Sequence, residues 1–455
     1  MDLKKMIQIT LVTGIALVAI SCNNGQKQKA ADGLLLQDVT LIDGNGGKPQ
    51  IHTDILLQGD SIAVIGQNLD TTNMKILDLN GKTIMPALIS DHVHIGSLKG
   101  TANKAEYYTE GNIRTQLNKY QDYGVLNIMV MGSDRPLLFE KGIRDRSVAG
   151  NYPGARLHSA AYGFGVPKGA PPIEFAMDYV YRPEKPEQVA AQMDSLTKLK
   201  PDFVKIWIDD FGGKYKKMDP AIYKEIILQA HQRNLRVAAH AYYLSDARQL
   251  VVDGVDVIGH SIRDNVIDDA LVQQIKAKGV TYIPTLSLDE FAYIYARKPE
   301  WINDPFFKAS LQPGVYEMIT SEKYQNDLKN APNYATNIKA FETALKNLKK
   351  LYDAGVLIAM GTDSGAMPLR AQGFSEHLEL ELMVQAGLTP LQAITVATKN
   401  AARVLLIDKE FGTIEKGKTA DLLILNGNPV SDIKQTRSIY AVYKAGKEVS
   451  RGPIK

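Results

Sequence analysis

The chain of 455 residues has one cysteine, Cys22, and no large excess of charge of either sign. A single thiol cannot close a disulfide within the chain, so no disulfide framework supports the fold. The 53 Lys and Arg residues nearly balance the 50 Asp and Glu residues, which leaves a formal net charge of +3. No basic stripe interleaved with aromatics runs along the chain, so no nucleic-acid partner is predicted. The composition, 45% hydrophobic and 23% charged, is typical of a globular protein with a large core.

The N-terminus has the form of a signal peptide over residues 1–21. Two lysines precede an apolar stretch that is too short to span a bilayer, and small residues follow up to Cys22. The sequence "VAISC" resembles a bacterial lipobox, except that Ala19 stands where leucine is usual. We therefore predict lipidation of Cys22 and a polar tether over residues 22–32. The expected location is the bacterial cell envelope, facing the periplasm or the exterior, with the lipid anchor as the only membrane contact.

Strand and helix patterns divide the remaining chain into three parts. Residues 33–82 and 410–455 contain short alternating runs separated by Gly, Asn and Asp, which predicts a small β-sandwich built from both chain ends. Residues 83–409 alternate apolar strand patterns with helical ones such as "AIYKEIILQAHQRN". The expected strands are "TIMPALI", "GVLNIMVMG", "ARLHSAA", "FVKIWI", "LRVAAHA", "VDVIGHS", "VTYIPTL" and "VLIAMGTD". Eight such units predict an α/β fold with a (β/α)8 TIM barrel.

Polar residues with metal-ligating side chains follow these strands. His92 and His94 are two residues apart in extended chain, which directs both imidazoles to the same side. His240, His260 and Asp363 stand at the ends of the fifth, sixth and eighth strands. The carboxyl ends of barrel strands meet on one face, where barrel active sites lie. Four of the eight histidines in the chain are at these positions, and imidazole with carboxylate suits zinc and similar divalent ions.

Lys205 lies inside the apolar run "FVKIW". A lysine there is either a snorkelling side chain, whose ammonium reaches water at the strand end, or a buried functional group. The run by itself leaves both interpretations open.

Several motifs resemble the amidohydrolase superfamily, whose members are metal-dependent hydrolases on a barrel flanked by a small β-sandwich. "PALISDHVH" looks like its signature after the first strand and "MGTDSG" like its aspartate motif after the eighth. The stretch from "HLELELMVQAGLTP" to "ADLLILNGNP" resembles its C-terminal pattern, in the branch related to imidazolonepropionases and prolidases. The resemblance extends over the chain from Gly33 onward.

The resemblance implies a ligand set and a mechanism. In binuclear members the lysine of the fourth strand is carboxylated and bridges two metals, so Lys205 is expected to carry a carbamate between two zinc ions. One metal is expected on His92, His94 and Asp363, and the other on His240 and His260. The resemblance assigns to Asp363 the transfer of a proton from the attacking hydroxide to the leaving group.

Other polar residues near the strand ends have two interpretations each. Arg263 either binds a substrate carboxylate or forms a loop salt bridge with Asp264. Tyr242 and Tyr243 follow His240 and either enter the pocket or pack under the barrel rim. His158 is predicted to be structural.

The remaining histidines and one long segment complete the sequence-based expectations. His52, His231 and His377 are predicted at the surface, on a strand edge or on helices. The segment 289–337 is rich in aromatics, so it is either a lid that sets specificity or a set of packed helices.

The favoured function is hydrolysis of an amide, lactam, cyclic or peptide-like C–N bond, other than an ordinary peptide bond, in a small molecule. The alternatives are a mononuclear deaminase or imidazolone hydrolase, an Xaa-Pro dipeptidase, and a solute-binding lipoprotein with a degenerate site. The stretch "AYGFGVPKGAPPIEF" lacks the histidine-bearing glycine motif expected of the prolidase-like enzymes, which weakens the dipeptidase interpretation. The sequence leaves the substrate and the oligomeric state open, including a homo-oligomer.

Overall fold

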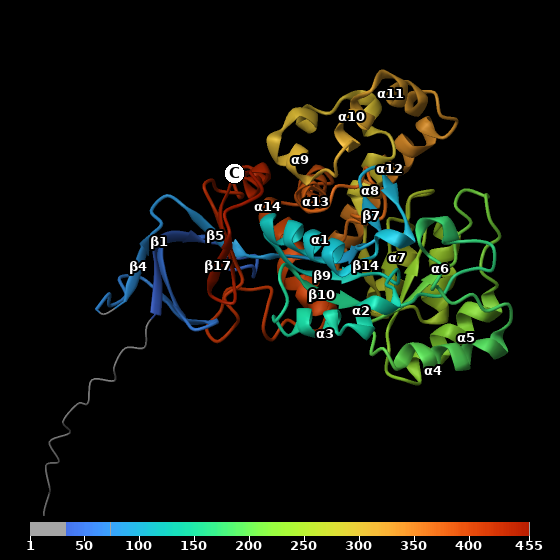
Figure 1. The fold of residues 1–455 in the computed structure, drawn as a ribbon, viewed down its shortest axis with the longest axis horizontal. Coiled ribbons are helices and arrows are strands. Elements are labelled where there is room, and N and C mark those ends of the chain that lie inside the picture. The colour runs from blue at the N-terminus through green and yellow to red at the C-terminus, as the bar shows by residue number, and fades with distance from the viewer. Residues whose placement is uncertain (1–32, 73, 455) are drawn as a thin grey trace, which may run out of the picture.

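The computed structural model describes residues 33–72 and 74–454. The predicted signal peptide, the tether and Cys22 lie outside the described residues. None of the helices described is long and apolar enough to cross a membrane. Figure 1 shows a sheet at one end of the molecule and a larger body of strands and helices beside it.

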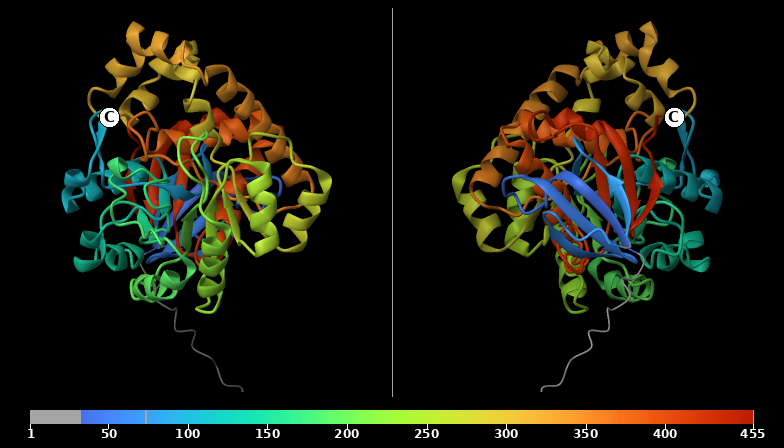
Figure 2. Two further views of the ribbon diagram at one scale, coloured as in Figure 1. Left: turned by 90° about the vertical axis from the view of Figure 1, so that its right-hand side faces the viewer. Right: turned by 90° about the vertical axis from the view of Figure 1, so that its left-hand side faces the viewer.

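The end sheet has eight strands and is built from both ends of the chain, as predicted. Its order is β17-β16-β15-β5-β1-β2-β3, with β4 paired to β1, and Figure 2 shows the early and late strands side by side. One set of its side chains forms a separate apolar cluster that includes Leu36, Ile55 and Leu422. The strands are β1 (Gly33–Leu41), β2 (Gln50–Gln58), β3 (Ser61–Gly66), β4 (Lys75–Asp78), β5 (Thr83–Pro86), β15 (Leu422–Leu425), β16 (Ile439–Lys444) and β17 (Lys447–Ser450).

The prediction of one continuous strand over residues 83–89 was wrong. β5 pairs with β1 and β15 in the end sheet, whereas β6 (Leu88–Val93) pairs in parallel with β9. Pro86 is the last residue of β5, and proline has no N–H to donate to a strand ladder. The chain therefore passes from one sheet to the other at Pro86 and Ala87.

The α/β body contains short, buried, parallel strands. β10 (Arg156–Ser159), β9 (Val125–Val130) and β6 form one sheet. β11 (Val204–Trp207), β12 (Val237–His240), β13 (Val257–Gly259) and β14 (Thr281–Ile283) form another. Every residue of these strands is buried, which explains why they read as continuous apolar runs rather than alternating ones.

The eighth predicted strand is an extended segment, 356–364, rather than a full strand. It makes single parallel bridges between Ile358 and Tyr282 of β14 and between Ser364 and Val93 of β6. A further parallel bridge joins Phe164 to Ile206 of β11. These bridges lie in the gaps between the two parallel sheets.

Helices lie outside the parallel strands in both views of Figure 2. α5 shows why they form: Asp219 caps the amide of Ala221, Pro220 opens the helix, and buried side chains recur at helical spacing from Ile222 to Ala230. α5 spans Pro220–His231. The others are α1 (Glu110–Asp122), α2 (Pro136–Glu140), α3 (Ile143–Val148), α4 (Val189–Thr197), α6 (Leu244–Asp253), α7 (Asp269–Ala277), α12 (Tyr334–Asp353), α13 (Phe374–Gln385), α14 (Pro390–Thr395) and α15 (Ala401–Val404).

The aromatic segment after β14 forms α8 (Leu286–Phe291), α9 (Pro305–Ser310), α10 (Val315–Thr320) and α11 (Glu322–Lys329), above the body in Figure 1. Trp301 contacts Phe307 and Phe374 of α13, with ring centroids 4.7 and 5.0 Å apart. Aromatic packing against α13 therefore accounts for Trp301 and Phe307. Asn333 and Asn337, at the end of the segment, nevertheless line the cavity described below.

Candidate metal centre

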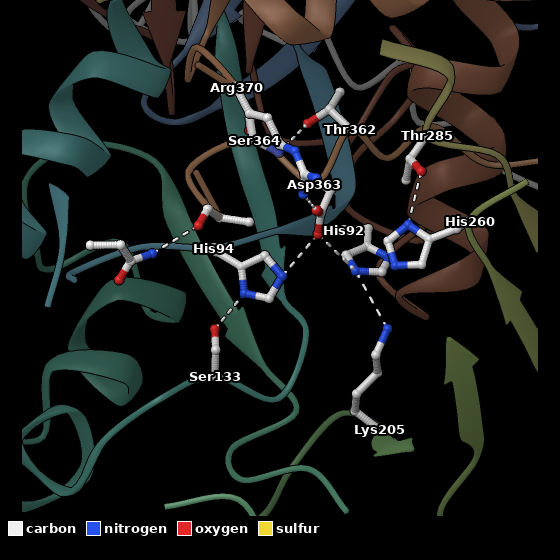
Figure 3. A network of polar contacts seen from close by, with 12 residues as sticks. His92, His94, Ser133, Lys205, His260, Thr285, Thr362, Asp363, Ser364 and Arg370 are labelled. Carbon is white, nitrogen blue, oxygen red and sulfur yellow. Dashed lines mark hydrogen bonds and ion pairs between the residues drawn. The ribbon is translucent and has the colours of Figure 1, made fainter. Parts of the chain in front are cut away.

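The predicted ligands converge at the carboxyl ends of the parallel strands, as Figure 3 shows for most of them. His92 lies in β6 and His94 just after it, whereas Lys205 lies within β11. His240 ends β12, His260 follows β13, and Asp363 stands at the end of the extended segment. All six side chains are buried.

His92, His94 and Asp363 form the first ligand group. Each offers one ligand atom, and these atoms lie within 4.8 Å of one another. Oδ1 of Asp363 is 2.9 Å from Nε2 of His94 and 3.5 Å from Nε2 of His92. The other nitrogen of His94, Nδ1, is 2.5 Å from the hydroxyl of Ser133, which orients the ring.

His240 and His260 form the second ligand group. Their ring centroids are 4.3 Å apart, and the ring of His260 is 4.4 Å from that of His92. Thr285 Oγ1 contacts Nδ1 of His260 at 2.9 Å, and Asp209 Oδ2 contacts Nε2 of His240 at 3.1 Å. An oxygen thus contacts one ring nitrogen of His260 and one of His240. The two ligand groups are in contact through the rings of His92 and His260.

The protonation states suit a divalent ion. Burial lowers the pKa of His92 and His260 well below the ordinary value, and the nearby cation of Lys205 adds to this effect. Burial also lowers the pKa of His240, although Asp209 opposes the shift. Nδ1 of His92 and Nδ1 of His240 are buried without a hydrogen-bond partner among the described residues. Neutral imidazoles with free lone pairs, beside a carboxylate, are the donor set that zinc prefers.

Lys205 is fully buried, so the snorkelling interpretation is wrong. Its Nζ lies 3.4 Å from Nε2 of His92, and its stem passes Gly132, where an added Cβ would come within 2.8 Å of Cβ of Lys205. Burial lowers the pKa of the amine to about 7, with only the carboxylate of Asp363 acting in the opposite direction. A large neutral fraction of the amine is therefore present near neutral pH.

Asp363 carries a firmly ionised carboxyl group. Burial raises its pKa, but the guanidinium of Arg370 and the imidazole of His94 outweigh burial and hold the pKa well below the usual range. Arg370 donates through Nη1 to Oδ2 of Asp363. The residue has φ of +58°, in the left-handed region that non-glycine residues seldom adopt.

Both ligand groups face a cavity of about 550 Å³. One part of its lining is an apolar wall made by side chains of four separate segments of the chain. The members of this apolar wall are Phe175, Met177, Trp207, Phe211, Leu288 and Met367. The ring of Phe211 lies nearly parallel to that of His240, at a centroid distance of 5.4 Å. The cavity can therefore enclose an apolar group next to the ligand groups.

The predicted substrate contacts occupy different places. Arg263 and Tyr242 line the cavity, with the guanidinium 4.6 Å from the ring centre of Tyr242. Arg263 pairs with Asp289 at 2.9 Å, so the predicted alternative of a salt bridge with Asp264 was wrong. Tyr243 is not part of the cavity lining, and its hydroxyl donates to Asp210 at 2.8 Å.

Sequence reasoning missed Arg370 and Asp209. Asp209 directly follows the strand that carries Lys205, so its position at a strand end was a usable signal. Arg370 is seven residues beyond Asp363 in a loop, and no local pattern indicates that the chain folds back to place it there.

The remaining histidines divide into buried and exposed ones. His158 is buried, 3.4 Å from Asn127, and does not line the cavity, in agreement with a structural role. His52 and His231 are exposed, as predicted. The surface prediction for His377 was wrong, because it is fully buried in α13 and 2.9 Å from the carbonyl of Tyr123. Burial lowers its pKa to about 3.

Known proteins resemble this chain in sequence or in fold. Ochratoxinase from Aspergillus niger is 27% identical over 249 residues, which cover 54% of this chain and 44% of that protein. This chain thus spans less than half the length of that relative. Imidazolonepropionase from Shouchella clausii is 21% identical over 466 residues, covering 92% of each chain. The crystal structure of an Xaa-Pro dipeptidase with bound methionine has a TM-score of 0.71 and 24% identity, covering 92% of this chain and 100% of that one.

The fold and the ligand groups define a class: α/β proteins of TIM-barrel type that gather metal-ligating side chains at their strand ends. Residues 83–449 match the Amidohydrolase family, and the chain belongs to that family.

Proposed function

We propose that the protein is a metal-dependent hydrolase that cleaves a C–N bond of an amide, lactam, cyclic or peptide-like small molecule. One observation carries this proposal: two adjoining ligand groups, with a buried lysine beside them, face a single cavity with an apolar wall. Family membership supports it, and so do the sequence relatives named ochratoxinase and imidazolonepropionase.

The donor atoms support two divalent ions, which we propose are zinc. The first ligand group would hold one ion and the second ligand group the other. Lys205, next to His92, would join them as a carbamate. In that reaction the neutral amine attacks carbon dioxide, an N–C bond forms, and a proton leaves, so a neutral side chain becomes an anion. Full burial and the lowered pKa of Lys205 support this step.

The chain's own residues would supply the remaining chemistry. Bound divalent ions act as Lewis acids that lower the pKa of water and polarise the scissile carbonyl. The carboxylate of Asp363 would accept the proton of the attacking water and pass it to the leaving nitrogen. Ser133, Thr285 and Asp209 orient three of the imidazoles. The apolar wall would exclude bulk water and bind the hydrophobic part of the substrate.

Three alternatives to this function remain. A mononuclear deaminase or imidazolone hydrolase would use the same histidines with Lys205 unmodified. An Xaa-Pro dipeptidase has the same fold, but the structural likeness at 24% identity supports the fold alone. A solute-binding protein would not need the carboxylate of Asp363, because binding requires no group that transfers a proton.

We further propose that the eight strand positions form one closed barrel, with the end sheet folded as a small β-sandwich beside it. The bridges made by Ile358, Ser364 and Phe164 in the gaps between the two parallel sheets support closure. The lipid anchor at Cys22 and the location in a bacterial cell envelope rest on the sequence "VAISC".

Metal analysis followed by a substrate screen tests the proposed function. Purified protein should bind about two zinc ions per chain, and the loaded protein should hydrolyse members of a panel of N-acyl amino acids, Xaa-Pro dipeptides, lactams and imidazolones. A single ion would favour the mononuclear alternative. Tight zinc binding without hydrolysis of any compound in the panel would favour the solute-binding alternative.

A further inference from the structure

A buried carboxylate lies behind the first ligand group, on the first turn of α13. Glu376 is fully buried, and its Oε1 accepts hydrogen bonds from the hydroxyls of Thr362 at 2.7 Å, Ser364 at 2.8 Å and Ser90 at 3.2 Å. Its Oε2 accepts from the amide of Gly373 at 2.9 Å. Four donors thus meet one carboxylate, which is an unusually complete set for a buried group.

The three hydroxyls come from the two chain segments that carry the first ligand group. Thr362 and Ser364 are the immediate neighbours of Asp363, and Ser90 precedes His92 by two residues. Glu376 therefore connects the segment of Asp363 to the strand of the histidines through side chains alone. Figure 3 shows Thr362 and Ser364 around Asp363, close to His92 and His94.

The backbone at Asp363 needs such support. Asp363 has a φ of +58°, and a non-glycine residue keeps that conformation only where its surroundings impose it. Thr362 Oγ1, which donates to Glu376, also accepts from the amide of Ser364 at 3.1 Å and so closes a loop around Asp363. The amide of Asp363 donates to the carbonyl of His92 at 2.8 Å. Side-chain and backbone contacts together determine where the Asp363 carboxylate points.

Glu379, one turn further along α13, shows what a purely structural buried glutamate contacts. Glu379 is equally buried and accepts from the amides of Leu286 and Ser287, both at 2.7 Å. Those amides belong to the start of α8, and the link from there to the Asp363 segment is a long one, from the hydroxyl of Ser287 to the carbonyl of Thr362 at 3.5 Å. Both glutamates therefore contribute to packing of α13, but only Glu376 contacts the residues that flank Asp363.

We propose that Glu376 is a positioning residue that aims the carboxylate of Asp363 at the first ligand group. The inference rests on the proposed function in one respect, because the kinetic effect requires that Asp363 act in hydrolysis. The geometric effect is independent of turnover, since a displaced Asp363 weakens metal binding whether or not a substrate is known.

Glu376→Gln is the test variant and Glu379→Gln is the matched control. Glutamine keeps one accepting oxygen and has a donating NH2 group in place of the other, so it cannot accept from the three hydroxyls and from the amide of Gly373 at the same time. Zinc affinity is measured by competition with a chromophoric chelator, and kcat and KM are measured with the best substrate of the panel. We expect Glu376→Gln to lower the zinc affinity of one site or kcat by about 10–100-fold, with KM little changed. Glu379→Gln should retain the wild-type zinc affinity and kcat even if it lowers the melting temperature.

Thr362→Val provides a second route that leaves Glu376 in place. It removes the hydroxyl with little change of volume, so its effect on zinc affinity should be non-additive with that of Glu376→Gln in a double-mutant cycle. If Glu376→Gln does not fold, Thr362→Val and Ser364→Ala carry the test, and wild-type zinc affinity in both would overturn the proposal. Equal losses in Glu376→Gln and Glu379→Gln would also overturn it. Absence of hydrolysis by the wild type would refute the proposed function, while the zinc measurements would still decide the role of Glu376.

Discussion

Lys205→Met is expected to stabilise the metal-free protein and to reduce the stability that the protein gains from zinc. In the metal-free protein the amine is fully buried, and burial lowers its pKa from 10.5 to about 7. Methionine is unbranched, like the lysine stem, and fills the same space without a charge. Removal of the amine therefore removes a penalty on folding, provided that no metal or carbamate is present.

The size of the penalty follows from the shift in pKa. Between about pH 7 and pH 10.5 the unfolded chain binds more protons than the folded one at this site, so the wild type gains stability as the pH rises. A shift of about 3.5 units corresponds to roughly 5 kcal/mol, an upper limit that applies below about pH 7. The advantage of Lys205→Met should be largest there and vanish toward pH 10.5.

Zinc and bicarbonate should stabilise the wild type more than they stabilise Lys205→Met. A ligand that binds only the folded state stabilises it by about 2.7 kcal/mol at 100 times its Kd and by about 4.1 kcal/mol at 1,000 times. The wild type, with two ions, gains twice from this effect, whereas Lys205→Met is expected to hold one ion or none. Urea denaturation measures the free energy of unfolding of both proteins. It is done at pH 7 and at pH 9.5, first in EDTA and then in zinc with bicarbonate.

Lys444→Met is the control for a buried lysine outside the ligand groups. Burial lowers the pKa of Lys444 to about 8, and its Nζ donates to the carbonyl of Gly154 at 2.7 Å. Its removal should change the stability of the protein by the same amount with and without zinc. The reasoning about Lys205 is refuted if Lys205→Met is less stable than the wild type in EDTA at pH 7, or if zinc stabilises the two proteins equally.

Three other substitutions test separate parts of the proposed function. Asp363→Asn keeps a ligating oxygen but removes the base, so kcat should fall by about 10²–10⁴-fold while zinc at the second ligand group remains; near-normal turnover with both ions bound would exclude the proton-transfer role. Arg263→Lys should raise KM about tenfold for substrates with a carboxylate and leave uncharged substrates unaffected, as a comparison of paired acids and amides would show. Cys22→Ala should move the protein from the membrane fraction to the soluble fraction or leave the signal uncleaved. A wild type that is already fully soluble after fractionation would rule out the lipid anchor.

The sequence by itself determined the strand–helix alternation and the choice of the candidate ligands. Apolar runs such as "FVKIWI" and "LRVAAHA" are local patterns, and each ligand stands at or near the end of one of them. Parallel strands place their carboxyl ends on one face, so His92, His240 and Asp363 could be assigned to a common site before any contact was known. The family resemblance lay in short motifs that contain these ligands, such as "PALISDHVH" and "MGTDSG".

Only the tertiary structure decided the contacts between distant segments. The break between β5 and β6 depends on pairing with β15, more than 300 residues away along the chain, and the burial of His377 depends on Tyr123 and Thr436. Arg370 reaches Asp363 through a loop that has no periodic pattern. Burial and long-range pairing depend on which surfaces exclude water together in the packed molecule. A local sequence pattern does not specify which distant segments those surfaces belong to.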